Sequence, residues 1–113
     1  MAQYIIYFNQ TWVGDHSEEW FASRGPLANA VVEEIKAAGA YVFAAGVDED
    51  ETRAFGADAT SGAPVVTDGP VPVKEARIGG LTIVDVDDDE AAKMWGGKIA
   101  EACGWPQEIR RVY

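Results

Sequence analysis

The sequence predicts one α+β domain in which helices cover one face of an antiparallel sheet. Two observations support this fold class. The order strand, helix ending in glycine, strand occurs twice, and a segment rich in turn residues separates the two units. A chain of 113 residues also has the length of a single domain, 1–113, and can bury about two-thirds of the surface of its unfolded form.

The first unit begins with a strand at Tyr4–Phe8, a continuous apolar run rich in β-branched and aromatic residues. Such a run is typical of a buried central strand. A polar loop follows, and capping-box spacing within it predicts a short helix that begins near Ser17. That helix is expected to carry Trp20 and Phe21 on its apolar side.

A longer helix is predicted from Pro26 to Gly39, because proline suits a first helical turn and glycine suits a left-handed C-cap. One stripe of apolar residues repeats along it at i, i+4 and i+8: Leu27, Val31 and Ile35. A second strand, 40–44, completes the first unit.

The segment 48–62 is polar and long for a loop, so it is mobile, functional, or hides a weak strand. The turn Thr67-Asp68-Gly69-Pro70 comes next, and two short segments flank it, 64–66 and 71–73. This arrangement predicts a hairpin, and its prolines favour the edge of a sheet.

The second unit begins with a strand at 77–86, in which Gly79–Gly80 indicates a bulge or a close backbone approach. A helix follows, with acidic residues at its start and Gly104 at its end. Its interior Gly96–Gly97 costs about 1 kcal/mol per glycine relative to alanine, which indicates close packing or a kink. A last strand is expected at 108–113. The apolar stripe of the helix is Ala91, Trp95, Ile99 and Cys103.

Two strand-helix-strand units around a hairpin form the split βαβ pattern of a ferredoxin-like sandwich. The strands are apolar runs rather than clean alternations, so the sheet face opposite the helices must also be covered. A second copy of the chain can cover it. We therefore expect a homodimer with its sheets face to face, a dimeric α/β-barrel-like assembly.

The charge of the chain excludes several partners. The net charge is -10, with 19 acidic and 9 basic residues, and no basic stripe is present. Nucleic acids and anionic membranes are therefore not expected partners. Cys103 is the only cysteine, which favours a reducing compartment, and the cytoplasm is the expected location.

No metal and no cofactor are expected. The acidic run 48–51 could bind a hard cation, but it lacks the glycine-punctuated pattern of a calcium loop. We therefore interpret it as a solvated run. A phosphate-binding loop is not recognisable, because Gly79–Gly80 lies within a predicted strand.

Three motifs together resemble the YCII-like family, DGPF-domain subfamily. They are Val66-Thr67-Asp68-Gly69-Pro70, Ile78-Gly79-Gly80-Leu81, and Ile83-Val84-Asp85-Val86-Asp87-Asp88. The segment 30–39 is also similar to the first helix of that family, and the match is weakest at 48–62. The resemblance implies a ferredoxin-like dimer with a cleft between the sheet and its loops. It also implies a His-Asp pair as the active-site element, and some relatives are dehalogenating or lactone-processing enzymes of aromatic breakdown.

The sequence departs from the pattern of this family at three places. Ala28 stands where the first helix of the family has a histidine, when the two are aligned by their distance to Gly39. Val71 stands where a phenylalanine usually follows Asp-Gly-Pro. The segment 73–76 reads Val-Lys-Glu-Ala where Glu-Thr-Lys-Glu is typical.

Asp68 and His16 are the candidate catalytic residues. Asp68 is either a turn former or a carboxylate held at a cleft mouth as a general acid or base. His16 is the only histidine, and its ordinary pKa suits proton transfer, although a solvated loop residue is the simpler interpretation. The candidate ligand-binding residues are Thr67, Gly69, Pro70, Tyr7, Tyr41, Trp12 and Trp20.

Two functions follow from these candidates. The first is a small cofactor-independent enzyme that acts on a small organic molecule, with Asp68 transferring protons. The alternative is a non-catalytic small-ligand-binding or accessory protein that has the fold without the family histidine. A third interpretation, a purely structural interaction module, requires a filled core without a pocket.

Overall fold

The computed structural model describes residues 1–71 and 77–113 of the chain. Strands and helices alternate as the sequence predicts, with a short additional strand pair between the two units. The elements in chain order are β1 (Ala2–Asn9), η1 (Gln10–Trp12), α1 (Glu18–Ala37), β2 (Tyr41–Gly46), η2 (Glu51–Arg53), β3 (Phe55–Asp58), β4 (Val65–Asp68), β5 (Ile78–Val86), α2 (Asp89–Cys103) and β6 (Glu108–Val112).

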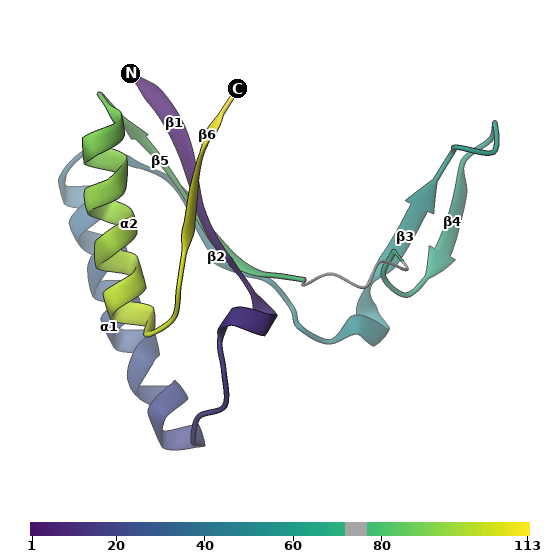
Figure 1. Cartoon of the computed structure of the whole chain (residues 1–113), viewed down its shortest axis with the longest axis horizontal. Coiled ribbons are helices and arrows are strands. Elements are labelled where there is room, and N and C mark those ends of the chain that lie inside the picture. The colour runs from purple at the N-terminus through teal and green to yellow at the C-terminus, as the bar shows by residue number, and fades with distance from the viewer. Residues whose placement is uncertain (72–76) are drawn as a thin grey trace.

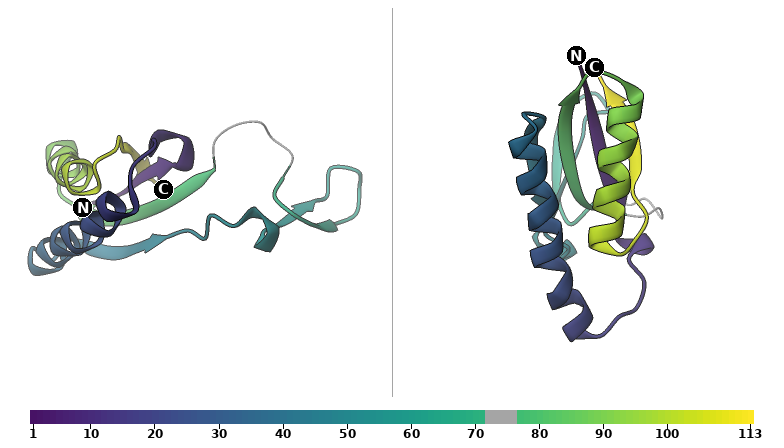
Figure 2. Two further views of the ribbon diagram at one scale, coloured as in Figure 1. Left: turned by 90° about the horizontal axis from the view of Figure 1, so that it is seen from below. Right: turned by 90° about the vertical axis from the view of Figure 1, so that its left-hand side faces the viewer.

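The main sheet has four strands in the order β2-β5-β1-β6, and each neighbouring pair is antiparallel. Both helices lie on one face of this sheet (Figure 1, Figure 2). The predicted α+β fold class is therefore confirmed. The strand order and the two βαβ units are compatible with a ferredoxin-like sandwich.

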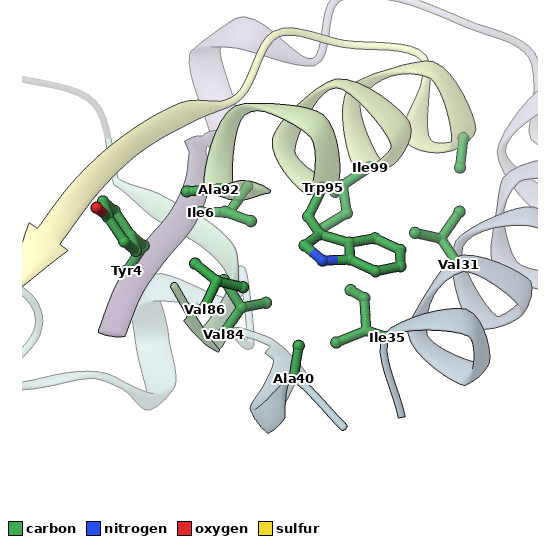
Figure 3. Close-up of a cluster of buried hydrophobic side chains, with 11 residues drawn as sticks. Tyr4, Ile6, Val31, Ile35, Ala40, Val84, Val86, Ala92, Trp95 and Ile99 are labelled. Carbon is green, nitrogen blue, oxygen red and sulfur yellow. The ribbon is translucent and has the colours of Figure 1, made fainter. Parts of the chain in front are cut away.

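The core lies between the helices and the central strands (Figure 3). Trp95 of α2 and Ile35 of α1 meet side chains of β1 and β5 there. A Cβ atom at Gly96 would overlap the side chain of Ile109, so α2 approaches β6 closely. Gly96 therefore fits close packing, one of the two alternatives that the sequence indicates, whereas a Cβ atom at Gly97 would meet nothing within 4 Å. The buried core residues are Tyr4, Ile6, Val31, Ile35, Ala40, Val84, Val86, Ala92, Trp95, Ile99 and Ala102.

Helix α1 is one continuous helix, so the prediction of two helices is wrong. The hydroxyl of Ser17 caps it by accepting a hydrogen bond from the amide of Trp20 at 3.1 Å. Pro26 therefore lies inside the helix rather than in its first turn. Leu27 is 46% exposed, whereas Val31 and Ile35 are buried, so only part of the predicted apolar stripe reaches the core.

The segment 48–62 contains a strand, which is one of the three alternatives left open by the sequence. β3 pairs with β4 in a separate two-stranded sheet, which we call the arm. The hairpin predicted around Thr67-Asp68-Gly69-Pro70 is therefore wrong in its pairing, because Thr67 and Asp68 belong to β4. Gly69 follows with a φ of 88° and donates to the Ala54 carbonyl at 2.8 Å. Of the predicted partner segment 71–73, Val71 is not in a strand, and 72–73 lie outside the described residues.

The arm projects from the body on the side of the sheet that faces away from the helices (Figure 1, Figure 2). The radius of gyration is 16.1 Å, whereas a compact domain of this length has about 13 Å. Arg77 holds the base of the arm: its Nε pairs with Glu51 at 3.2 Å and its Nη2 donates to the Val71 carbonyl at 3.0 Å. The Arg77 carbonyl accepts from the Gln10 amide at 2.8 Å, which joins this base to the end of β1.

Candidate functional site

A cavity of about 500 Å³ lies between α1 and the half of the sheet formed by β2 and β5. Small residues leave this space open, since larger side chains at the same places would fill it. They come from three elements: Ala28 from α1, Ala44 and Gly46 from β2, and Gly80 from β5. A Cβ atom at Gly80 would lie 2.8 Å from the Phe8 ring, so this glycine marks the close approach that the sequence predicts.

The walls of the cavity are largely apolar, with a few polar groups. The Nε2 atom of Gln107 is buried and has no hydrogen-bond partner within the part of the chain that the structure describes. Thr82 is a buried polar residue of the same wall. Cys103 also lines the cavity, and burial raises the pKa of its thiol, so the neutral form is favoured.

Charged residues of α1 lie at the solvent side of this cavity. Lys36 pairs with Glu33 at 3.4 Å, and both side chains are well exposed. The Lys36 ammonium also lies 4.9 Å from the ring centroid of Tyr41, a cation–π distance. Tyr41 is therefore the predicted ligand-binding residue that the structure places at the cavity.

Tyr7 lies elsewhere, on the sheet face opposite the helices. Its hydroxyl donates to the Glu108 carboxylate, which also accepts from Arg110 Nε at 2.8 Å. The hydrogen bond to Glu108 raises the pKa of Tyr7, and the same bond together with Arg110 lowers the pKa of Glu108. The ring of Trp12 has its centroid 6.1 Å from that of Tyr7.

His16 belongs to an aromatic cluster near the start of α1. Its ring stacks on Trp20 with centroids 3.6 Å apart, and its Nε2 lies 3.0 Å from the Val13 carbonyl. Phe21 and Trp105 contact Trp20 from other directions. Phe21 and Trp105 also line a second hollow of about 520 Å³, beside Phe8 and Glu49.

Asp68 and its neighbours lie on the arm. Asp68 is exposed and sits opposite Phe55 in the β3–β4 register. Thr67 lines a hollow of about 410 Å³ within the arm, and Gly69 and Pro70 follow directly. These four residues are consecutive in the chain, and none of them lines the cavity. The arm lies away from α1, near whose start His16 stacks on Trp20 (Figure 1).

Sequence reasoning missed the polar groups of the cavity. A single glutamine between Pro106 and the last strand carries no signal of the direction in which its side chain points. Thr82 is hidden within an apolar strand pattern, and Cys103 belongs to the apolar stripe of a helix, so neither pattern predicts a polar group at a cavity. Among residues 1–71 and 77–113, no group of three or more potential metal ligands comes together.

The helices of the described residues are too short or too polar to cross a membrane. A comparison of the chain with protein-family models finds no match, and a comparison with curated proteins finds none either. The structure itself establishes an α+β fold in which two helices pack on a four-stranded antiparallel sheet.

Proposed function

We propose that this protein binds a small, largely apolar molecule in the cavity between α1 and the sheet. The observation that carries the proposal is a cavity of about 500 Å³ whose lining is largely apolar and includes the polar residues Gln107 and Thr82. Ligand pockets commonly have volumes of about 300–1,000 Å³ and combine apolar walls with a few polar groups. The Nε2 atom of Gln107 is buried without a partner in the described chain, which costs about 1–3 kcal/mol, and the amide would remove that cost by turning toward a ligand acceptor.

The chemistry of the walls defines the class of ligand. Ile6, Val32 and Ile99 suit an apolar body, aromatic or aliphatic. Gln107 suits a carbonyl or carboxyl oxygen as hydrogen-bond acceptor. Lys36 at the solvent side tolerates a single negative charge, although Glu33 already pairs with it. The proposed ligand is therefore an apolar carbonyl compound or a monocarboxylic acid.

We also place the chain near the YCII-like proteins of the DGPF subfamily. The strand order β2-β5-β1-β6 and the three motifs quoted above support this placement. Ala28, at the position of the family histidine, lines the cavity. The cavity therefore has no imidazole at that point, and this favours the non-catalytic alternative over an enzyme.

Catalysis by Asp68 stays a prediction. Within one copy of the chain, Asp68 lies on the arm and does not line the cavity. A catalytic Asp68 would have to act on a ligand bound by the arm or by another copy. Asp68→Asn should then abolish turnover without unfolding the protein, and unchanged turnover would exclude this role.

The test of ligand binding is a thermal-shift screen with apolar carbonyl compounds and monocarboxylic acids. Binding to the folded state raises Tm by mass action. Ala28→Phe fills the cavity and should remove the shift, whereas Ala30→Phe, on the exposed side of the same helix, should keep it. A screen without any shift, or equal shifts in both variants, would contradict the proposal.

A further inference from the structure

The second hollow, of about 520 Å³, is lined by aromatic rings from three parts of the chain. They belong to Phe8 of β1, Phe21 of α1 and Trp105, which follows α2. The ring centroid of Trp105 is 5.0 Å from that of Phe8 and 6.4 Å from that of Phe21. The face of an aromatic ring carries partial negative charge, so rings gathered around one space attract a cation placed over them.

The lining of this hollow is held in place by the sheet. A Cβ atom at Gly79 or Gly80 would overlap the Phe8 ring, so the two glycines let that ring lie against β5. Gln10, which also lines the hollow, donates its backbone N–H to the Arg77 carbonyl at 2.8 Å. A site formed before the ligand arrives loses less conformational entropy on binding.

Glu49 contributes a carboxylate to the same hollow. Within residues 1–71 and 77–113, it is the one acid of the run 48–51 that forms no ion pair. The others each pair with an arginine at 3.0–3.2 Å: Asp48, Asp50 and Glu51. The described residues also place no lysine or arginine in the lining. The charge of Glu49 is therefore complementary to a cation that enters the hollow.

We propose that the second hollow binds an alkylated organic ammonium ion, whose alkyl groups contact the rings and whose charge is stabilised by the rings and Glu49. Aromatic rings around one space are a recurrent way of recognising such ions. A bare metal ion fits this lining less well, because hard cations take six or more oxygen ligands and the lining is mostly apolar. The net charge of -10 also concentrates cations near the surface.

This inference goes beyond the function proposed above. The cavity between α1 and the sheet is proposed to take a neutral or singly negative molecule, whereas the second hollow takes a positive one. Phe8 lines both spaces and therefore separates them, so a substitution of Phe8 would change both at once. The tests below use residues that line only the second hollow.

The first test compares choline with the neutral alcohol in which a carbon atom replaces the choline nitrogen. The two probes have the same shape, so a difference in Kd measures the contribution of the charge. In an NMR titration at constant ionic strength, choline should bind at least about tenfold more tightly. Equal affinities, or no saturable binding of choline up to about 10 mM, would overturn the proposal.

The same titration locates the site in the wild-type protein. The indole N–H signal of Trp105 should move as choline is added, because its ring lines the hollow. The indole signal of Trp95, which is buried in the core, should stay. The reverse pattern would overturn the assignment. This measurement needs no substitution, so it stands even if a variant fails to fold.

Glu49→Gln tests the carboxylate. It should raise the Kd for choline roughly tenfold and leave the Kd for the neutral alcohol unchanged. Glu90→Gln is the matched control, because it removes the same charge at the start of α2, about 20 Å along the helix from Trp105. Its Kd for choline should stay within about twofold of the wild-type value. Equal effects of the two substitutions would reduce the result to net charge and overturn the site.

Phe21→Leu tests the rings, since it keeps an apolar side chain and removes the aromatic face. The Kd for choline should rise roughly threefold or more, and the Kd for the neutral alcohol should change less. Phe43→Leu is the control, because Phe43 is an exposed aromatic residue of β2 outside the hollow. An unchanged Kd for choline in Phe21→Leu would exclude a role of this ring.

Ala28→Phe separates this proposal from the preceding one. Filling the first cavity should remove the thermal shift by carbonyl compounds and keep the binding of choline. A failed screen for carbonyl compounds would leave the choline result standing. Loss of choline binding in a folded Ala28→Phe protein would place the cation in the first cavity and overturn the assignment to the second hollow.

Discussion

Ala28 of α1 and Gln107, the residue before β6, line the same cavity although they are far apart in the chain. Ala28 leaves space, and Gln107 has a buried Nε2 atom without a hydrogen-bond partner in the described residues. In the proposed function, a ligand acceptor would offset the cost of that buried donor. This relationship determines how variants at the two positions should behave.

Gln107→Leu should change stability and binding in opposite directions. Replacing an unpaired buried donor with an apolar side chain removes its desolvation cost, so the free protein should gain about 1 kcal/mol. The ligand loses its hydrogen bond, so any thermal shift should shrink. Gln3→Leu is the control, since Gln3 is exposed on β1 and should change neither quantity. A destabilised Gln107→Leu protein that still binds would contradict this role.

Tyr7 and Glu108 predict a dependence of stability on pH. The hydrogen bond from Tyr7 lowers the pKa of Glu108, so its contribution is present above the unfolded pKa of about 4.3 and lost as pH falls through the folded value. The same bond raises the pKa of Tyr7, so that contribution is present below about pH 10 and lost as pH rises through the folded value.

Tyr7→Phe tests this coupling. The stability advantage of the wild type over the variant should be largest between about pH 5 and 9 and should shrink at both ends. Urea unfolding across the pH range measures this stability advantage. In an absorbance titration at alkaline pH, the variant should lack the tyrosine whose pKa is raised in the wild type. Tyr113→Phe, at the exposed C-terminus, serves as control and should give a flat difference. A Tyr7→Phe difference that is equally flat would exclude the coupling.

Pro26→Ala distinguishes one continuous helix α1 from two separate helices of which the second begins at Pro26. Proline inside a helix removes a hydrogen bond and costs up to about 3 kcal/mol relative to alanine, so the substitution should stabilise the protein by about 1–3 kcal/mol. Had Pro26 begun a separate helix, its loss would be neutral or destabilising. Chemical unfolding measures the difference. Pro64→Ala, in the β3–β4 connection, should lie close to zero.

The fold was largely predictable because its strands and helices have strong local patterns. β1 and β5 are long apolar runs, and Gly39 and Gly104 have positive φ values where helix-ending glycines were expected. The continuity of α1 was not predictable, since Pro26 is locally compatible with a helix start. Ser17 caps the first half, the second half buries Val31 and Ile35, and the backbone stays helical through Pro26 between them.

The candidate site was less predictable than the fold. The sequence Phe55-Gly56-Ala57-Asp58 has low strand propensity, so its pairing with β4 depends on tertiary structure. Asp68-Gly69 has the local signature of a hairpin turn, and Gly69 does adopt a positive φ, but Asp68 ends a strand. Gln107 was not identifiable at all, because one polar residue does not specify what its side chain faces.

The glycine pair of α2 gives a comparison in which two neighbouring identical substitutions should have opposite effects. A Cβ atom at Gly96 would overlap the Ile109 side chain, whereas nothing lies within 4 Å of one at Gly97. Gly97→Ala should therefore stabilise by about 1 kcal/mol through helix propensity. Gly96→Ala gains the same propensity but overpacks the contact with β6, and a net loss of about 1–2 kcal/mol is expected.

Chemical unfolding of the two variants measures the contrast directly. The double variant Gly96→Ala with Ile109→Val removes part of the overlapping side chain and should recover some of the loss. Equal stabilisation by both alanines would mean that α2 and β6 separate without cost. In that case close packing would not explain Gly96, and the contact between α2 and β6 would be looser than the core beside it.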